Sequence, residues 1–264
     1  MSVVKKEGKL LINNKAASVR TPLQAGDEVV VSLGKEIADA TPTAMPLQIV
    51  YEDDDILLIN KAPQLVTHPT RYHQTDTLAN GIYHHWQENG ETGKVRFVNR
   101  LDMDTSGIVC IAKNKYVHHF IQQQMAQQKV KKLYWAIVEG ELKKKNDIIN
   151  APICRNEADG ILREVNLQGK ACATAYMVLQ YFPATNLSLV QIELLTGRTH
   201  QIRVHMRHIG HPVLGDGLYH EKSADIDRQA LHASSIGFMH PRTKKYETFQ
   251  APIWEDMNQI LMKN

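Results

Sequence analysis

The chain contains few cysteines and no long apolar run, and both features narrow its class. Its 264 residues include three cysteines, which are far apart and form no CxxC pair. Isolated cysteines in apolar surroundings are typical of buried free thiols in a reducing compartment, and they argue against a disulfide framework. The first residues lack the apolar segment of a secretory signal, and no stretch approaches the length of a membrane span. We therefore predict a cytoplasmic protein with no membrane partner.

Net charge is also small. The formal charge is +3, from 31 lysines and arginines against 28 acidic residues, which argues only weakly for a polyanionic partner. The basic residues are nevertheless clustered, at Lys94, Arg96 and Arg100, at Lys129, Lys131 and Lys132, at Lys143 to Lys145, at Arg198, Arg203 and Arg207, and at Arg242, Lys244 and Lys245. Clusters that converge in space would form a phosphate-binding surface, whereas any single cluster is equally well explained as solvated loop and strand ends.

Composition divides the chain into three parts. Residues 1–38 contain two short apolar runs separated by turns, a pattern that predicts a small hairpin unit. Residues 39–46 are small, polar and punctuated by proline, which is typical of a linker. Residues 47–264 are long enough to bury a large core, and they show no internal repeat or low-complexity tract.

Within the third part, periodicity predicts several elements. Residues 47–61 indicate a β-hairpin, and 131–140 indicate a strand with two largely apolar faces. We expect Asp76 to cap a helix that carries Leu78, Ile82 and Trp86 on one face. We also expect an amphipathic helix over 116–129, a loop-rich region over 141–175, strands over 176–179 and 187–195, and a helix capped by Thr199 and ended by Gly210.

One stretch combines two carboxylates, a turn and a buried strand. Residues 100–107 are Arg-Leu-Asp-Met-Asp-Thr-Ser-Gly, and the apolar run Ile-Val-Cys-Ile-Ala follows them. A rigid strand fixes what the preceding loop presents, so Asp102 and Asp104 are candidate catalytic carboxylates. Either carboxylate could instead form a simple Asx-turn before Thr105.

The same stretch resembles the signature of the RluA-type pseudouridine synthases. Three further segments match that family in the correct order: Lys-x-Tyr-x-Ala at 132–136, the run from Leu195 to His205, and Leu-His-Ala at 231–233. Residues 1–38 resemble the back half of the small alpha-L RNA-binding module, with no counterpart of its two front helices. The chain departs from the family pattern at Asn99, where many relatives have His, and at 62–64, where they have Pro-x-Gly.

The resemblance implies an α+β catalytic domain over 47–264, with a mixed, mostly antiparallel sheet flanked by helices. It implies an enzyme that isomerises specific uridines of structured RNA, ribosomal or transfer, to pseudouridine without a cofactor or metal. We expect the protein to act as a monomer.

The resemblance also assigns residues. Asp102 matches the essential aspartate, Tyr134 would lie against the uracil, and Arg203 would pair through a bidentate fork with Asp102 and keep it ionised. RNA contacts are expected from Arg100, which in relatives can fill the space of the flipped nucleotide, and from Leu231, which matches an apolar residue beneath the active site. The basic clusters, and not the resemblance, add Lys131, Lys132 and Arg198 to the expected RNA contacts.

Each assignment has an ordinary alternative. Tyr134 and Leu231 would otherwise be core residues, and Arg100 a phosphate contact. One rival function is a catalytically silent RNA-binding or ribosome-assembly protein, which the presence of all three catalytic matches disfavours. Another is a metal-dependent hydrolase built on the histidines at 200, 205, 208 and 211, but His200 and His205 do not share a helix face, and no acidic or cysteine ligand supports them.

Overall fold

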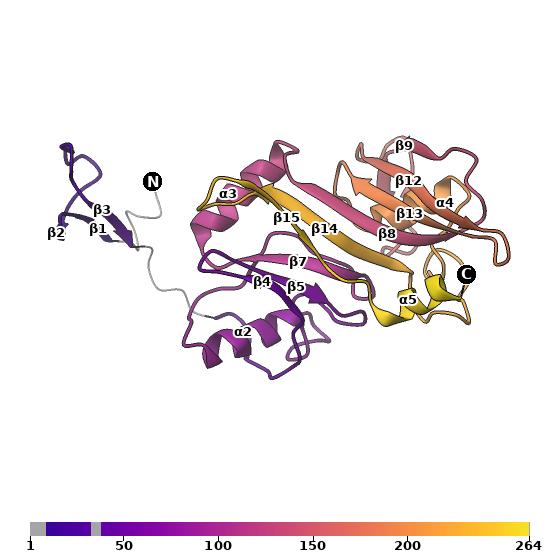
Figure 1. Ribbon diagram of the computed structural model, residues 1–264, viewed down its shortest axis with the longest axis horizontal. Helices are drawn as coiled ribbons and strands as arrows, with labels where there is room; N and C mark the ends of the chain where they lie inside the picture. The colour runs from indigo at the N-terminus through magenta and orange to yellow at the C-terminus, as the bar shows by residue number, and fades with distance from the viewer. Residues whose placement is uncertain (1–8, 33–37, 264) are drawn as a thin grey trace.

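A computed structural model describes residues 9–32 and 38–263 (Figure 1). A ten-stranded sheet dominates it, with strand order β4-β5-β7-β14-β8-β13-β12-β9, β6 pairing with β7, and β15 pairing with β14. The strands are β1 (Lys9–Ile12), β2 (Lys15–Ala16), β3 (Val29–Ser32), β4 (Ile49–Glu52), β5 (Ile56–Lys61), β6 (Arg96–Phe97), β7 (Ser106–Ala112), β8 (Lys131–Glu139), β9 (Asn146–Asn150), β10 (Ile153–Arg155), β11 (Arg163–Val165), β12 (Ala173–Phe182), β13 (Leu187–Leu194), β14 (Leu231–Met239) and β15 (Tyr246–Gln250). The helices are α2 (Leu78–Glu88), α3 (Lys115–Ala126), α4 (Gln201–His208) and α5 (Glu255–Met262).

The predicted α+β architecture is confirmed. Every strand pair of the large sheet is antiparallel except β7 with β14, which are parallel. Strands β5 and β7 are buried along their whole length, which explains their continuous apolar sequences. Alternate residues face opposite cores: Leu57 and Val109 pack with α2, whereas Leu58 and Cys110 face a second, larger cluster.

The parallel pair β7 and β14 is short. It is registered only at Ser106 with His232 and at Gly107 with Ala233, and β8 pairs with β14 on the other side. Gly107 has φ +111°, and a Cβ there would collide with the backbone of Ala233. Only glycine therefore permits this close approach. The loop that precedes β7, which carries Asp102, consequently lies beside the start of β14.

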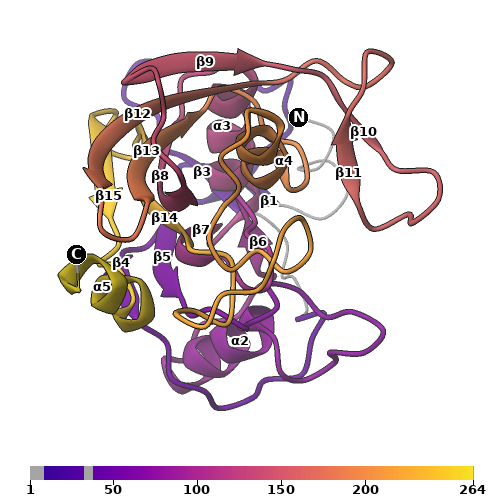
Figure 2. The same cartoon turned by 90° about the vertical axis from the view of Figure 1, so that its right-hand side faces the viewer.

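Strands β8, β13, β12 and β9 form the other half of the sheet. Helix α4 contacts β12 and β11. Residues of its first turn line the same hollow as Leu231, the first residue of β14, and Thr105, which precedes β7. Strands β10 and β11 form a separate hairpin that projects from this half of the molecule (Figure 2). We expected a loop-rich region over 141–175. That prediction was wrong for 146–150, 153–155 and 163–165, which are strands of only three to five residues.

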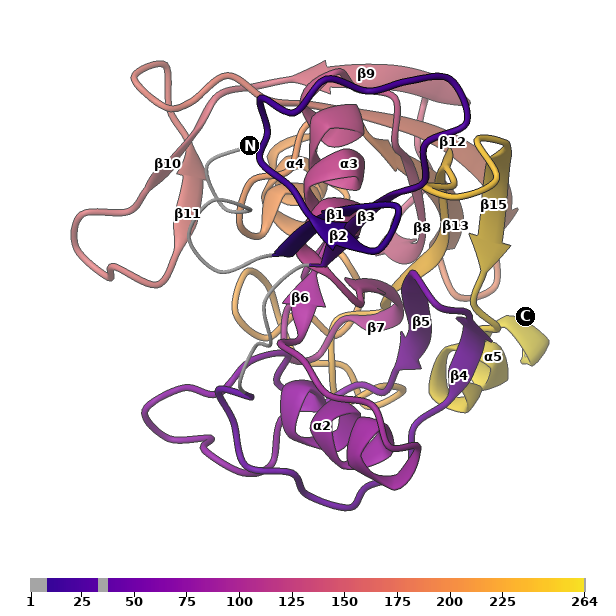
Figure 3. The same ribbon diagram turned by 90° about the vertical axis from the view of Figure 1, so that its left-hand side faces the viewer.

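The N-terminal part forms a sheet of its own, in the order β2-β1-β3 (Figure 3). The predicted unit over 1–38 lies partly outside the described residues, because those at 1–8 and 33–37 are not described. Within 9–32 and 38–263, no helix combines the length and apolar character that a membrane crossing requires.

Two predicted helix caps are wrong. Thr77 is the N-cap of helix α2, and its backbone N–H donates to the Asn80 side chain. The Asp76 carboxylate instead contacts the His73 ring. Thr199 is exposed, and the turn before α4 is organised by Gln201, whose Oε1 accepts from the backbone N–H of Arg198. The three cysteines are free as expected, but Cys154 is only half-buried, whereas Cys110 and Cys172 are buried.

Candidate active site

A hollow of about 620 Å³ opens at the junction of β7 and β14. Loop 97–103, the turn 197–200, the first turn of α4 and the start of β14 contribute to its walls. Seven of the eight residues predicted for the site line it: Arg100, Asp102, Lys132, Tyr134, Arg198, Arg203 and Leu231. Lys131 does not line the hollow, and its Nζ lies 3.8 Å from a Glu193 carboxylate oxygen.

The loop that carries Asp102 is held through its backbone. The fully buried Lys61 donates from Nζ to the carbonyl of Met103 at 2.7 Å and to the carbonyls of Ala62 and Leu65 at 2.8 and 2.9 Å. Burial lowers the pKa of Lys61 to about 7. Lys61 was not predicted as a site residue, because its partner Met103 is 42 residues away in the sequence.

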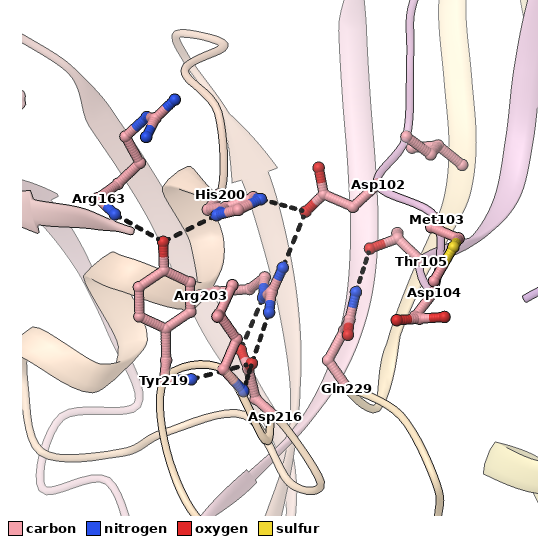
Figure 4. Close-up of polar contacts among 12 residues, drawn as sticks. Asp102, Met103, Asp104, Thr105, Arg163, His200, Arg203, Asp216, Tyr219 and Gln229 are labelled. Carbon is pink, nitrogen blue, oxygen red and sulfur yellow. Dashed lines mark hydrogen bonds and ion pairs between the residues drawn. The ribbon is translucent and has the colours of Figure 1, made fainter. Parts of the chain in front are cut away.

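Two further side chains donate hydrogen bonds to the backbone of the loop that carries Asp102. Thr67 Oγ1 donates to the Leu101 carbonyl at 3.2 Å, and Arg228 Nη1 donates to the Asp104 carbonyl at 3.1 Å. The Asp104 side chain itself lies away from the Arg203 guanidinium (Figure 4). Side chains from several distant segments thus fix the backbone around Asp102, while the Asp102 side chain stays 32% exposed at the hollow.

Lys61→Met should separate loop positioning from RNA binding. The change leaves three backbone carbonyls without their buried donor, so we expect a loss of about 2–4 kcal/mol in the free energy of unfolding. Turnover should fall further than RNA affinity, because the loop that presents Asp102 loses its anchor. Urea unfolding and single-turnover kinetics measure these effects, with the exposed Lys143→Met as the matched control. Equal losses in affinity and turnover would contradict the positioning role of Lys61.

Arg203 reaches two carboxylates. Its Nε and Nη2 donate to the Asp216 carboxylate at 2.7 and 2.6 Å, and its Nη1 donates to Oδ2 of Asp102 at 3.3 Å. The predicted bidentate fork to Asp102 is therefore wrong, because the fork is taken by Asp216, which is 1% exposed, and Asp102 receives a single contact (Figure 4). Asp216 was not among the residues predicted for the site from the sequence.

His200 and Tyr219 complete the surroundings of Asp102. His200 Nε2 lies 3.8 Å from Asp102 Oδ2, and its Nδ1 lies 2.8 Å from the Tyr219 hydroxyl. The Arg203 guanidinium carbon lies 5.0 Å from the centroid of the Tyr219 ring. From the sequence, His200 was a candidate only for a metal ligand, and Tyr219 was not predicted to belong to the site.

Tyr134 and Leu231 form an apolar wall of the hollow. They lie on the adjacent strands β8 and β14, and both are buried. Burial, and then the negative charge of Asp102, raise the pKa of Tyr134, so its hydroxyl is protonated at neutral pH. This wall suits one face of a planar, uncharged ring.

Basic side chains form part of the rim of the hollow. Arg100 and Arg198 are exposed, and Lys132 is half-buried, with its pKa lowered by burial. Asn99, next to Arg100, has a structural role, because its side chain bonds the backbone of Cys110 and Ile108. Across the part of the chain that the structure describes, no three histidines, cysteines or carboxylates are grouped so that they could hold a metal ion.

The arrangement supports a specific chemistry. A carboxylate beside a guanidinium can act as a nucleophile or base while it stays charged. An apolar wall and a basic rim can hold a base and the phosphates on either side of it. These groups fit a reaction on a nucleotide that has been turned out of its stack.

Comparison with known proteins identifies the class. A model of the family described as RNA pseudouridylate synthase matches residues 55–208. An uncharacterized RNA pseudouridine synthase of Bacillus subtilis, YhcT, is 41% identical over 250 residues, which are 94% of this chain and 83% of the relative. The ribosomal large subunit pseudouridine synthase D of Vibrio cholerae is 34% identical over 274 residues, covering 97% of this chain and 83% of the relative. The solved structure of human RNA pseudouridylate synthase domain containing 1 matches with a TM-score of 0.65 and 30% identity over 79% of this chain and 84% of that one.

The chain belongs to the RNA pseudouridylate synthase family, and to its RluA-type branch. It is accordingly a pseudouridine synthase, an isomerase, as the sequence motifs predicted.

Proposed function

We propose that the protein converts specific uridines of structured RNA, ribosomal RNA first among them, to pseudouridine, with Asp102 as the nucleophile and no cofactor. The observation that supports this most strongly is the position of Asp102. Its side chain lines the hollow of about 620 Å³, contacts Arg203, and shares the hollow with the apolar side chains of Tyr134 and Leu231.

The reaction is an isomerisation that balances without any other reagent. The bond from uracil N1 to the ribose C1′ breaks, a bond from C5 to C1′ forms, the C5 proton leaves and N1 gains a proton. A carboxylate that acts on the sugar or base, together with a surface that retains the free uracil, meets these needs. We assign these tasks to Asp102 and to the wall of Tyr134 and Leu231.

The target uridine must leave its stack to reach Asp102, which costs a few kcal/mol of unstacking energy. Arg100 stands at the exposed rim, where its side chain can occupy the vacated space or hold a phosphate. A silent RNA-binding protein would need neither the Asp102–Arg203 contact nor the apolar wall.

Ribosomal RNA is proposed because relatives at 34% identity carry the name ribosomal large subunit pseudouridine synthase D. Mapping pseudouridines in ribosomal and transfer RNA from cells with and without this protein tests the proposal. We expect the loss of one or a few ribosomal positions. A loss confined to transfer RNA would contradict the proposed substrate, and unchanged maps in both RNAs would contradict the proposed function.

The basic rim should set the salt dependence of RNA binding. Lys132→Gln with Arg198→Gln removes two cations from the rim, so the slope of log affinity against log salt should fall by about 1.4 to 1.8. Filter binding or fluorescence anisotropy at several salt concentrations measures the slope. The exposed pair Lys143→Gln with Lys145→Gln, outside the hollow, carries the same charge change and should leave the slope nearly unaltered. An equal fall in both double variants would place the RNA elsewhere.

A further inference from the structure

His200 has a backbone conformation that its sequence neighbours do not explain. It is the N-cap of α4, with φ 56° and ψ 18°, in the left-handed region that residues other than glycine seldom adopt. Its side chain makes no capping bond to the helix. This conformation instead directs the ring toward Tyr219 and Asp102, and the side chain is only 14% exposed (Figure 4).

The contacts of Tyr219 favour one tautomer of His200, with the proton on Nε2. The buried Tyr219 hydroxyl oxygen accepts from the backbone N–H of Arg163 at 2.9 Å and lies 2.8 Å from His200 Nδ1. A phenol has one hydrogen to donate, and donation to Nδ1 gives that hydrogen a partner inside the protein. Neutral His200 then carries its own hydrogen on Nε2, which faces Oδ2 of Asp102 at 3.8 Å.

The charges around the ring favour this neutral form. Burial lowers the pKa of His200, and the cations Arg203 and Arg163 lower it further, against the opposing effects of Asp102 and Asp216. At neutral pH the ring is therefore a neutral donor on its Nε2 side. Contacts at catalytic groups are often long without substrate and shorten in the bound complex.

We propose that His200 is a positioning residue for Asp102, and that Tyr219 holds it in the Nε2–H tautomer. This inference rests on the proposed function and deepens it. When RNA fills the hollow, Nε2–H donates to Oδ2, the oxygen that Arg203 already contacts. Two donors then hold one oxygen of the carboxylate, and Oδ1 is presented to the nucleotide.

Two substitutions at His200 test the donor. Gln places an amide N–H near the position of Nε2, whereas Asn tolerates the left-handed backbone but is too short to reach Asp102. Because the hydrogen bond that is lost is made to a charged group, His200→Asn should lower kcat about 30-fold with KM for RNA within threefold. His200→Gln should recover to within about fivefold of wild type. An Asn variant as active as the Gln variant would overturn the proposal.

Tyr219→Phe tests the tautomer directly. The ring that lies beneath Arg203 is kept, and only the hydroxyl is lost. A hydrogen bond to the neutral imidazole holds the pKa of His200 down, so that pKa should rise in the variant, as read by NMR of histidine-labelled protein assigned with His200→Asn. Tyr181→Phe, which loses a hydroxyl bonded to Asn186, is the matched control and should leave the titration of His200 unchanged. An unaltered titration in Tyr219→Phe would overturn the proposal.

The two residues should also act as one unit. Tyr219→Phe should lower kcat about tenfold alone and add little to His200→Asn, whereas additive effects would contradict the coupling.

The titration of His200 is measured without RNA, so its result does not depend on whether the protein modifies RNA. If the wild-type protein modified no RNA, the proposed function would be contradicted, and the titration would still test the hydrogen bond between Tyr219 and His200. In the same experiment Asp102→Asn should lower the pKa of His200, because the facing negative charge is removed. An unchanged pKa there would show that Nε2 does not face Asp102 in solution.

Discussion

Asp102→Asn is expected to fold, to bind RNA with nearly wild-type affinity, and to form pseudouridine at less than about one-thousandth of the wild-type rate. The amide has almost the size of the carboxylate, and its oxygen can still accept from Arg203 Nη1. It is neutral and cannot act as a nucleophile or a base, so the covalent or proton-transfer steps lose their agent. Single-turnover assays at saturating enzyme measure the rate separately from binding.

Asp104→Asn is the matched control for this loss. Asp104 is two residues away on the same loop, and its backbone carbonyl, which the substitution keeps, accepts from Arg228. We expect activity within about threefold of wild type, because the side chain lies away from Arg203 (Figure 4). Activity that disappears in Asp104→Asn and persists in Asp102→Asn would reverse the assignment of the two carboxylates.

Arg203→Met is expected to lose both stability and turnover. The substitution leaves the buried Asp216 carboxylate without its bidentate partner, and breaking a buried ion pair in this way costs about 3–5 kcal/mol. It also removes the cation beside Asp102, so turnover should fall at least about a hundredfold in the fraction that remains folded. Urea unfolding and assays corrected for folded protein give the two effects separately.

A companion variant separates structure from catalysis. Arg203→Met with Asp216→Asn removes the unpaired buried charge, so most of the stability should return while turnover stays low. Arg203→Lys should be intermediate in turnover, because one ammonium cannot reproduce the fork to Asp216 and the contact to Asp102 together. Recovery of turnover in the double variant would show that Arg203 supports the fold alone and contributes nothing at Asp102.

The parts of the fold that could be predicted are those indicated by the pattern of neighbouring residues in the sequence. Strand β8 and helix α3 follow from apolar runs and helical spacing, and the structure places them within a few residues of the predicted ranges. The stretch 100–107 could also be predicted as a candidate site, because a turn and a buried strand follow Asp102 directly in the sequence. The failed caps at Asp76 and Thr199 have a common cause. Several polar residues adjoin each helix start, and tertiary contacts choose among them.

The rest of the site could not be predicted because its contacts join distant segments. Lys61 and Met103 are brought together by the pairing of β5 with β7, and Asp216 meets Arg203 only after the chain turns back beyond α4. A single sequence carries no periodic signal for such pairs. The hydrogen bond between Tyr219 and His200 likewise depends on the position of the β10–β11 hairpin, since the backbone N–H of Arg163 donates to the same Tyr219 hydroxyl oxygen.

The most direct test is tritium release from RNA labelled at C5 of uridine, since forming pseudouridine expels that hydrogen. The RNA is prepared from cells that lack this protein, so that its target uridines are unmodified, and it is incubated with the purified wild-type protein or with Asp102→Asn. We predict release by the wild-type protein that reaches a plateau of one or a few equivalents per ribosomal RNA, and none by Asp102→Asn. Release that is equally fast with Asp102→Asn, or no release with the wild-type protein from either ribosomal or transfer RNA, would contradict the account.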